Sequence, residues 1–275
     1  MFPPEIEQYR DHHWQREASQ RIETVQQAEA FINHVGFANS LTDSRKPGPS
    51  LYISVCGRRD VQQPRNVQKD PEMSTAWLLK DEIVRRGRIY YGKLGTRRTM
   101  FVARHLVPSF YSLFGVSRKD ERKALSESAR KILAILRKEF ESASIDLRRD
   151  AGIDDRKAFN KAMDELQAKM LVIGSEVVYE PKFTYIWTLA EVRFAEELSS
   201  IPDRKTAITN IARTFIDSAG MTTPGELARI IGVSRPDAGI GNRNLLAQKY
   251  VSSPSTGTYQ LTDLASRLSI IGIGD

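Results

Sequence analysis

The segment STAWLLKDEIVRRGRIYYGKLGTRRTMFVAR, from Ser74 to Arg104, carries the clearest signal of the fold in this sequence. Apolar side chains at helical spacing in its first half predict an amphipathic helix that ends at Gly87. Two β-prone runs follow, over residues 89–94 and 99–103, and a turn of one glycine, one threonine and two arginines joins them. A helix followed directly by a basic two-stranded hairpin is typical of a winged helix-turn-helix unit.

This stretch also holds most of the chain's excess positive charge. Residues 74–104 contain eight basic and two acidic side chains, and the formal net charge of the whole chain is +7. A basic chain, with a pI near 9.5, favours a polyanionic partner. A membrane-surface helix requires an apolar face beside a basic one outside any fold, and the sequence has no such isolated segment. We therefore predict double-stranded DNA as the partner, and no membrane.

Composition limits the classes of protein to which this chain can belong. A chain of 275 residues with 40% hydrophobic content is long enough for two or three small domains with ordinary cores. Its single cysteine, Cys56, cannot form an internal disulfide, and with four histidines and no zinc-type spacing we predict no metal and no cofactor. Neither a signal peptide nor a membrane-spanning run is evident, so we expect a cytoplasmic protein.

One order of elements, a helix, a short element, a second helix and a hairpin, recurs along the chain. It predicts a mainly α fold with small β-hairpin wings, of the α+β class, made of three tandem winged helix-turn-helix units. We expect an N-terminal extension or loosely attached helix at residues 1–21, and units at residues 22–117, 118–203 and 204–275. The second unit should open with one long helix over residues 120–140, and Ser144 should cap the short helix after it.

Exposed polar side chains of the recognition helices and wings are the candidate DNA contacts, because such helices read base edges and wings reach phosphates. They are Arg85, Arg86, Arg88, Lys93, Arg97 and Arg98 in the first unit, Arg156, Lys157, Asn160, Lys161 and Lys182 in the second, and Arg235, Asn242, Arg243, Asn244 and Lys249 in the third. The alternatives are a solvated basic face for the arginines and the capping of a turn for the asparagines. Of Tyr90 and Tyr91, alternation places one in the core, and the other is free to stack on a base.

The sequence shows no common catalytic motif. It lacks a nucleotide-binding glycine loop, a zinc-type spacing and a serine elbow. Cys56 is expected to be buried rather than nucleophilic. Asp81 and Glu82 are neighbours on a helix and do not face each other, so Asp81 is expected to pair with a nearby basic residue.

Four segments resemble the tandem winged-helix DNA glycosylases of the AlkZ and YcaQ type, and most closely their AlkZ-related relatives. They are TVQQAEAFINHVGF (24–37), PGPSLYISVCGRRD (47–60), WLLKDE (77–82) and GRIYYGKL (87–94). The resemblance covers most of the chain. It implies a concave DNA-binding surface made by three winged helices, and hydrolysis of the N-glycosidic bond of alkylated or crosslinked bases.

The signature of that family is glutamine, a usually apolar residue, then glutamine or aspartate, which positions and activates the attacking water. Here it is met only by Gln68-Lys69-Asp70, with lysine at the centre. By resemblance, Gln68 and Asp70 are therefore the catalytic candidates. The alternative is that Asp70 and Pro71 simply begin the helix, as its cap and first residue.

These observations predict a double-stranded DNA-binding protein linked to DNA repair, and leave open whether it is a DNA glycosylase. A non-enzymatic transcriptional regulator and a protein-interaction scaffold are the alternatives.

Overall fold

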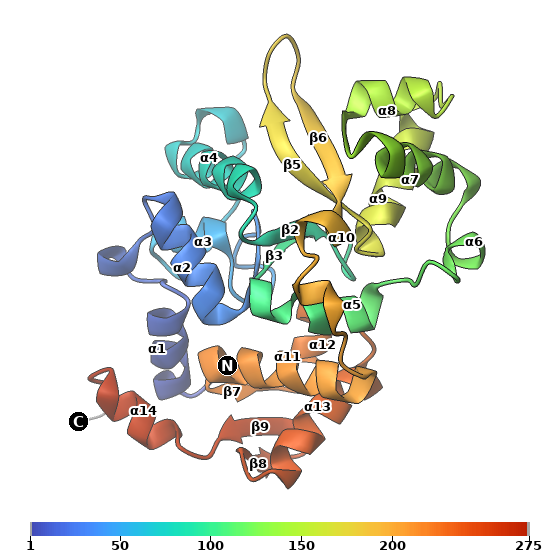
Figure 1. The fold of residues 1–275 in the computed structure, drawn as a ribbon. Helices are drawn as coiled ribbons and strands as arrows, with labels where there is room; N and C mark the ends of the chain where they lie inside the picture. The colour runs from blue at the N-terminus through green and yellow to red at the C-terminus, as the bar shows by residue number, and fades with distance from the viewer. Residues whose placement is uncertain (1, 274–275) are drawn as a thin grey trace.

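Three small sheets organise the protein, which is described here by a computed structural model of residues 2–273 (Figure 1). Each sheet has three antiparallel strands, in the orders β1-β3-β2, β4-β6-β5 and β7-β9-β8. In every case a short strand that precedes the hairpin in sequence pairs with the hairpin's last strand. The prediction of a mainly helical fold with small hairpin wings in three tandem units is confirmed.

The first unit follows the helix, strand, helix, helix, hairpin order. Its elements are α2 (Val25–Val35), β1 (Phe37–Asn39), α3 (Leu51–Cys56), η2 (Val67–Lys69), α4 (Pro71–Arg86), β2 (Tyr90–Lys93) and β3 (Thr99–Val102). Local chemistry sets its helix ends. Thr24 and Gln27 form a capping box at the start of α2, and Asp70 caps α4, which Gly87 ends in the left-handed region. After this unit come η3 (Arg104–Leu106) and α5 (Val107–Phe114).

The second unit repeats that order, and two local predictions for it are wrong. Its elements are α6 (Glu121–Ala124), α7 (Glu127–Glu139), β4 (Glu141–Ala143), α8 (Ser144–Asp150), α9 (Arg156–Ala168), β5 (Val172–Val178) and β6 (Thr184–Leu189). The helix expected over residues 120–140 is broken at Leu125, which is extended, because the Ser126 hydroxyl caps a new helix by accepting the Ala129 N–H. Ser144 does not cap α8, because its hydroxyl is used by the hairpin. It donates to the Tyr185 carbonyl and accepts from Trp187 Nε1.

The third unit is joined to the second by α10 (Ala190–Arg193) and η4 (Glu197–Ser199). Its elements are α11 (Arg204–Ala219), β7 (Met221–Thr222), α12 (Glu226–Ile231), α13 (Arg235–Ala247), β8 (Val251–Ser255) and β9 (Thr258–Leu261), followed by α14 (Leu264–Ile270). The predicted unit boundaries are compatible with this element order and stay a prediction. None of the helices within residues 2–273 is both long and apolar enough to cross a membrane.

Two hydrophobic cores divide the molecule differently from the three units. The larger core joins the first and third units and contains, for example, Phe31, Phe37 and Phe215. Most of the second unit packs around its own core, which includes Leu136 and Leu166. The first and third units therefore fold against one continuous interior, and the second unit stands beside it.

The N-terminal helix is an integral part of the larger core, so the expectation of a loosely attached helix is wrong. α1 (Pro4–His13), which is followed by η1 (Ala18–Gln20), buries Ile6 and Tyr9 completely. Arg10 Nη1 donates to Glu226 Oε1 of α12 at 2.8 Å, and Arg10 Nη2 donates to the Met221 carbonyl at 2.6 Å. These contacts span more than 200 residues, and the polar sequence of α1 gave no signal for them.

The wing of the first unit is packed into the third unit through two glycines. A Cβ atom at Gly95 would lie 2.4 Å from the Ile231 carbonyl oxygen, and one at Gly232 would lie 2.3 Å from the backbone carbon of Gly95. Backbone therefore meets backbone here, and no side chain fits between the two segments. The hairpin β5–β6 of the second unit, by contrast, stands out between α4 and α8 (Figure 1).

Candidate nucleic-acid interface

Arg85 and Arg86 at the end of α4, and Arg88 just after it, contact carboxylates of the protein itself. Arg85 Nε lies 4.0 Å from Glu176 Oε1 of β5. Arg86 Nη1 and Arg88 Nη1 lie 3.4 and 3.8 Å from Glu29 Oε2 of α2. Both glutamates come from outside residues 74–104, so the charge excess of that stretch is partly neutralised in space.

The wing of the first unit is divided between an internal and an exposed part. Lys93 Nζ lies 2.6 Å from Asp164 Oδ1 of α9, and the Lys93 amide donates to Gln167 Oε1 at 3.3 Å. Arg97 is exposed and Arg98 half-buried at the tip, and within residues 2–273 neither contacts a carboxylate. The wing therefore covers the C-terminal half of α9.

The N-terminal half of α9 remains open. The helix begins where the Asp155 carboxylate accepts the N–H groups of its first turn. The candidate contacts of this unit are all exposed: Arg156, Lys157, Asn160 and Lys161 on α9, and Lys182 at the tip of the β5–β6 hairpin. In the described part of the chain none of these four cations has a carboxylate partner, in contrast to the arginines of α4.

The third unit exposes its cations and turns its asparagines inward. Arg235 and Arg243 on α13 and Lys249 after it are exposed. Asn242 is only 8% exposed, and Asn244 Nδ2 donates to Thr209 Oγ1 of α11 at 2.8 Å. The Asn244 amide thus links α13 to α11, Asn242 is buried, and of the predicted contacts in this unit the three cations are the ones that are exposed.

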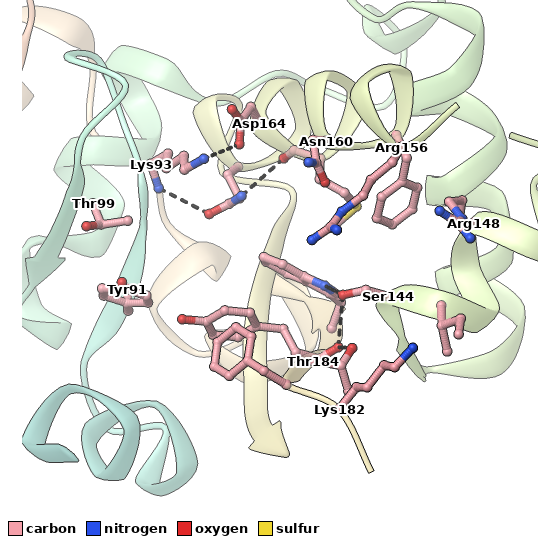
Figure 2. Close-up of a pocket in the computed structure, with 18 of the residues that line it drawn as sticks. Tyr91, Lys93, Thr99, Ser144, Arg148, Arg156, Asn160, Asp164, Lys182 and Thr184 are labelled. Carbon is pink, nitrogen blue, oxygen red and sulfur yellow. Dashed lines mark hydrogen bonds and ion pairs between the residues drawn. The ribbon is translucent and has the colours of Figure 1, made fainter. Parts of the chain in front are cut away.

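A cleft of about 760 Å³ lies between the second unit and the wing of the first (Figure 2). It is lined by α8, α9 and the β5–β6 hairpin on one side and by β2 and β3 on the other. Arg148, Arg156 and Lys182 gather toward one end, and Tyr91 and Thr99 lie at the other. Of the two neighbouring tyrosines, Tyr90 is the fully buried one and Tyr91 lines this cleft.

One wall of the cleft is aromatic. Tyr185 and Trp187 lie at alternate positions of β6, and Phe183 immediately precedes the strand. The three rings are neighbours, with centroids 5.5 and 5.3 Å apart. Trp187 Nε1 donates to Ser144 Oγ at 2.8 Å, which fixes the indole. Phe183, near the tip of the hairpin, is 48% exposed.

Behind this wall lies a buried ion pair that anchors the hairpin to α4. Lys80 Nζ lies 2.5 Å from Asp81 Oδ1, with both side chains at most 2% exposed, and it donates to the Tyr185 hydroxyl at 3.1 Å. The Tyr179 hydroxyl donates to Asp81 and accepts from Trp77 Nε1 at 3.0 Å. Burial raises the pKa of Tyr185 to about 12, so this phenol stays neutral. The expected pairing of Asp81 with a nearby basic residue is confirmed.

Neither Arg148 nor the aromatic wall was predicted from the sequence. The alternation of aromatic residues at 183, 185 and 187 was a usable signal, because strand positions two apart share one face. Arg148 carried no such signal, since it faces the cleft only through the packing of α8 beside the hairpin.

The two catalytic candidates lie apart from this cleft, at the start of α4. Gln68 is exposed in η2, and Asp70 Oδ1 accepts the Met73 N–H at 2.7 Å. Asp70 and Pro71 thus begin the helix as the structural alternative describes, and the catalytic assignment stays a prediction. Cys56 is buried as expected, and burial together with Glu72 raises the pKa of its thiol to about 12.

Three repeats of this element order in one chain define a tandem winged-helix protein. A model of the AlkZ-related family matches residues 22–230, so the chain belongs to the AlkZ-related family. Among solved structures it is similar to the DNA glycosylase AlkZ of Streptomyces sahachiroi, with a TM-score of 0.63 and 10% sequence identity over 96% of this chain and 71% of that one. This likeness shows a shared fold. A search of curated protein sequences found no significant match.

Proposed function

We propose that this protein binds double-stranded DNA, and that the exposed cations of α9, of the β5–β6 tip and of α13 contact the phosphates. The observation that carries the proposal is the contrast between these cations, which have no carboxylate partner within residues 2–273, and the arginines of α4, which do. Unpaired surface cations on recognition helices are the usual contacts to a phosphate backbone. Membership of the AlkZ-related family supports a role in DNA repair.

Charge reversal on α9 tests this proposal. Each phosphate contact that is lost removes about 0.9 from the slope of log K against log salt concentration. In Lys157→Glu/Lys161→Glu we therefore expect weaker duplex binding and a slope lower by about two, measured by fluorescence anisotropy between low and physiological salt.

Lys131→Glu/Lys138→Glu on α7 is the matched control, because it changes the net charge by the same amount and these lysines already lie near Glu127 and Glu139. An equal loss of slope in both variants would show a general charge effect and contradict the assignment of α9.

Base excision is the second candidate, favoured by the fold that this chain shares with a protein described as a DNA glycosylase. The glycosylase hypothesis predicts that the protein releases a base from alkylated duplex. It also predicts that Gln68→Ala and Asp70→Asn each abolish this release. Because Asp70 caps α4, the melting temperature of each variant is needed to separate lost chemistry from a weakened helix.

The two remaining hypotheses give different outcomes in the same assays. Intact DNA after long incubation, together with tight binding to one sequence, would support a non-enzymatic regulator. Failure to bind any duplex at low salt would overturn the DNA proposal and favour a protein-interaction scaffold.

A further inference from the structure

The cleft beside α9 has two chemically different ends. At one end are three cations, Arg148, Arg156 and Lys182, from three different elements (Figure 2). None of the three has a carboxylate partner in the part of the chain that the structure describes, although Glu180 also lines the cleft. The other end is neutral, since Tyr91 and Thr99 lie there and Lys93 is already paired with Asp164.

Between the two ends runs a wall of fixed aromatic rings. Ser144 holds the indole of Trp187, and Lys80 holds the hydroxyl of Tyr185, so neither ring needs to be ordered when a ligand stacks on it. Phe183, which follows Lys182 in the chain, extends the wall and is half-exposed. Phe183 and Tyr185 meet edge to face, at 87°, so a base that stacks on one of these rings meets the edge of the other. The cleft thus combines an aromatic wall with an anion-binding end, and its volume of about 760 Å³ is within the range of small-ligand sites.

A base inside an intact duplex does not fit this arrangement. Both of its faces are covered by neighbouring bases, so its ring cannot stack on Tyr185 or Phe183. The wing of the first unit also covers the C-terminal half of α9 through Lys93, which closes the cleft on that side. A nucleotide that has left the stack offers a free π-face and a phosphate at once.

We propose that this cleft binds one unpaired nucleotide, with its base against Phe183 and Tyr185 and its phosphate on Arg148, Arg156 and Lys182. The inference rests on the proposed duplex binding, which brings DNA to this face. The unpaired nucleotide has two sources with the same chemistry, a bulge within a duplex and a single-nucleotide 5′ overhang at a strand end.

Three DNA probes of one sequence test the proposal: an intact duplex, the same duplex with one bulged nucleotide, and the same duplex with a one-nucleotide 5′ overhang. We expect the bulged probe, the overhang probe or both to bind about tenfold more tightly than the intact duplex, because base–aromatic stacking contributes on that scale. The probe that is preferred identifies the source. Quenching of tryptophan fluorescence should accompany that preference, since Trp187 lies in the wall.

Variants distinguish the cleft from the surrounding basic face. Two variants change the cleft and leave both cores intact: Phe183→Ala and Arg148→Glu. Each should reduce the ratio between the affinity for the preferred probe and the affinity for the intact duplex to near one. Lys157→Glu, outside the cleft, should lower all affinities and keep that ratio.

Equal affinity for all three probes in the unmutated protein, or an unchanged ratio in both cleft variants, would overturn this inference and leave duplex binding intact. Failure of every probe to bind would instead overturn the proposed function itself.

Discussion

At the scale of single residues, the buried contact between Arg10 and Glu226 has the clearest energetic consequence. Both side chains are about 5% exposed or less, and their N–O distance is 2.8 Å. Glu226→Gln would leave the Arg10 guanidinium buried without its counter-charge, and removal of one partner of a buried pair costs about 3–5 kcal/mol. We expect the free energy of unfolding, measured in urea, to decrease by an amount of that size.

Glu191→Gln provides the matched control for this prediction. It removes the partner of Arg118 from a pair whose side chains are 71% and 43% exposed, and exposed pairs contribute less than about 1 kcal/mol. Similar losses in the two variants would show that the burial of Arg10 and Glu226 does not strengthen their contribution.

Residues whose role depends on near neighbours could be predicted from sequence, and those with distant partners could not. The end of α4 at Gly87 and the burial of Cys56 follow from local pattern. The partner of Lys93, by contrast, is Asp164, 71 positions later in the chain. A count of charge along the sequence therefore overstates the cations that are free to meet phosphate, because it cannot include pairs formed in space.

At the scale of elements, the docking of α1 onto α2 should depend on pH. His13 Nδ1 lies 2.7 Å from His34 Nε2, and burial lowers the pKa of His13 from its usual 6.5 to about 3. Between these values the unfolded chain binds a proton that the folded protein does not. Stability should therefore be highest above pH 6.5 and fall as the pH is lowered toward 3.

The replacement His13→Gln should make this dependence weaker. We expect the melting temperature of the unmutated protein to fall more between pH 7.5 and pH 5 than that of the variant. Parallel losses in the two proteins would show that His13 does not contribute to the acid sensitivity.

The hairpin β5–β6 should depend on its hydroxyl anchor to α4. Tyr179→Phe removes the acceptor for Trp77 Nε1 and the donor to the buried Asp81 carboxylate. An unsatisfied buried polar group costs about 1–3 kcal/mol, so amide hydrogen exchange in β5 and β6 should become about tenfold faster or more. The hairpin β8–β9 of the third unit is the internal control, and equal acceleration there would indicate global rather than local destabilisation.

Element boundaries show the same limit as single residues. The periodicity of residues 120–140 is helical almost throughout, yet the extended Leu125 and the cap at Ser126 divide the segment into two helices. The sequence contained the cap, but a serine inside an apolar periodic run does not by itself indicate a break. A hairpin with clear turn residues was predicted more accurately, because the runs at residues 89–94 and 99–103 contain β2 and β3.

At the scale of the whole molecule, the repeat of three units could be predicted, but their assembly could not. Each unit carries its own order of helices and hairpin, which periodicity reveals. The cleft has walls from two units, and the larger core joins the first unit to the third, although the second lies between them in the sequence. Such contacts depend on how complete units pack, for which a single sequence contains no local signal.

The two cores predict that the second unit unfolds separately from the rest. Leu136 is fully buried in the core of the second unit, and Ile32 is fully buried in the larger core. Replacement of either residue by alanine should lower the free energy of unfolding of the core that holds it by about 2–5 kcal/mol.

Cys56 is buried in the larger core, so its labelling by a thiol reagent in increasing denaturant reports the opening of that core. Leu136→Ala should lower the denaturant concentration at which part of the helix signal in circular dichroism is lost, and should leave the midpoint of Cys56 labelling unchanged. Ile32→Ala should lower the midpoint of Cys56 labelling. If Leu136→Ala lowers the labelling midpoint as much as Ile32→Ala, the two cores unfold as one cooperative unit.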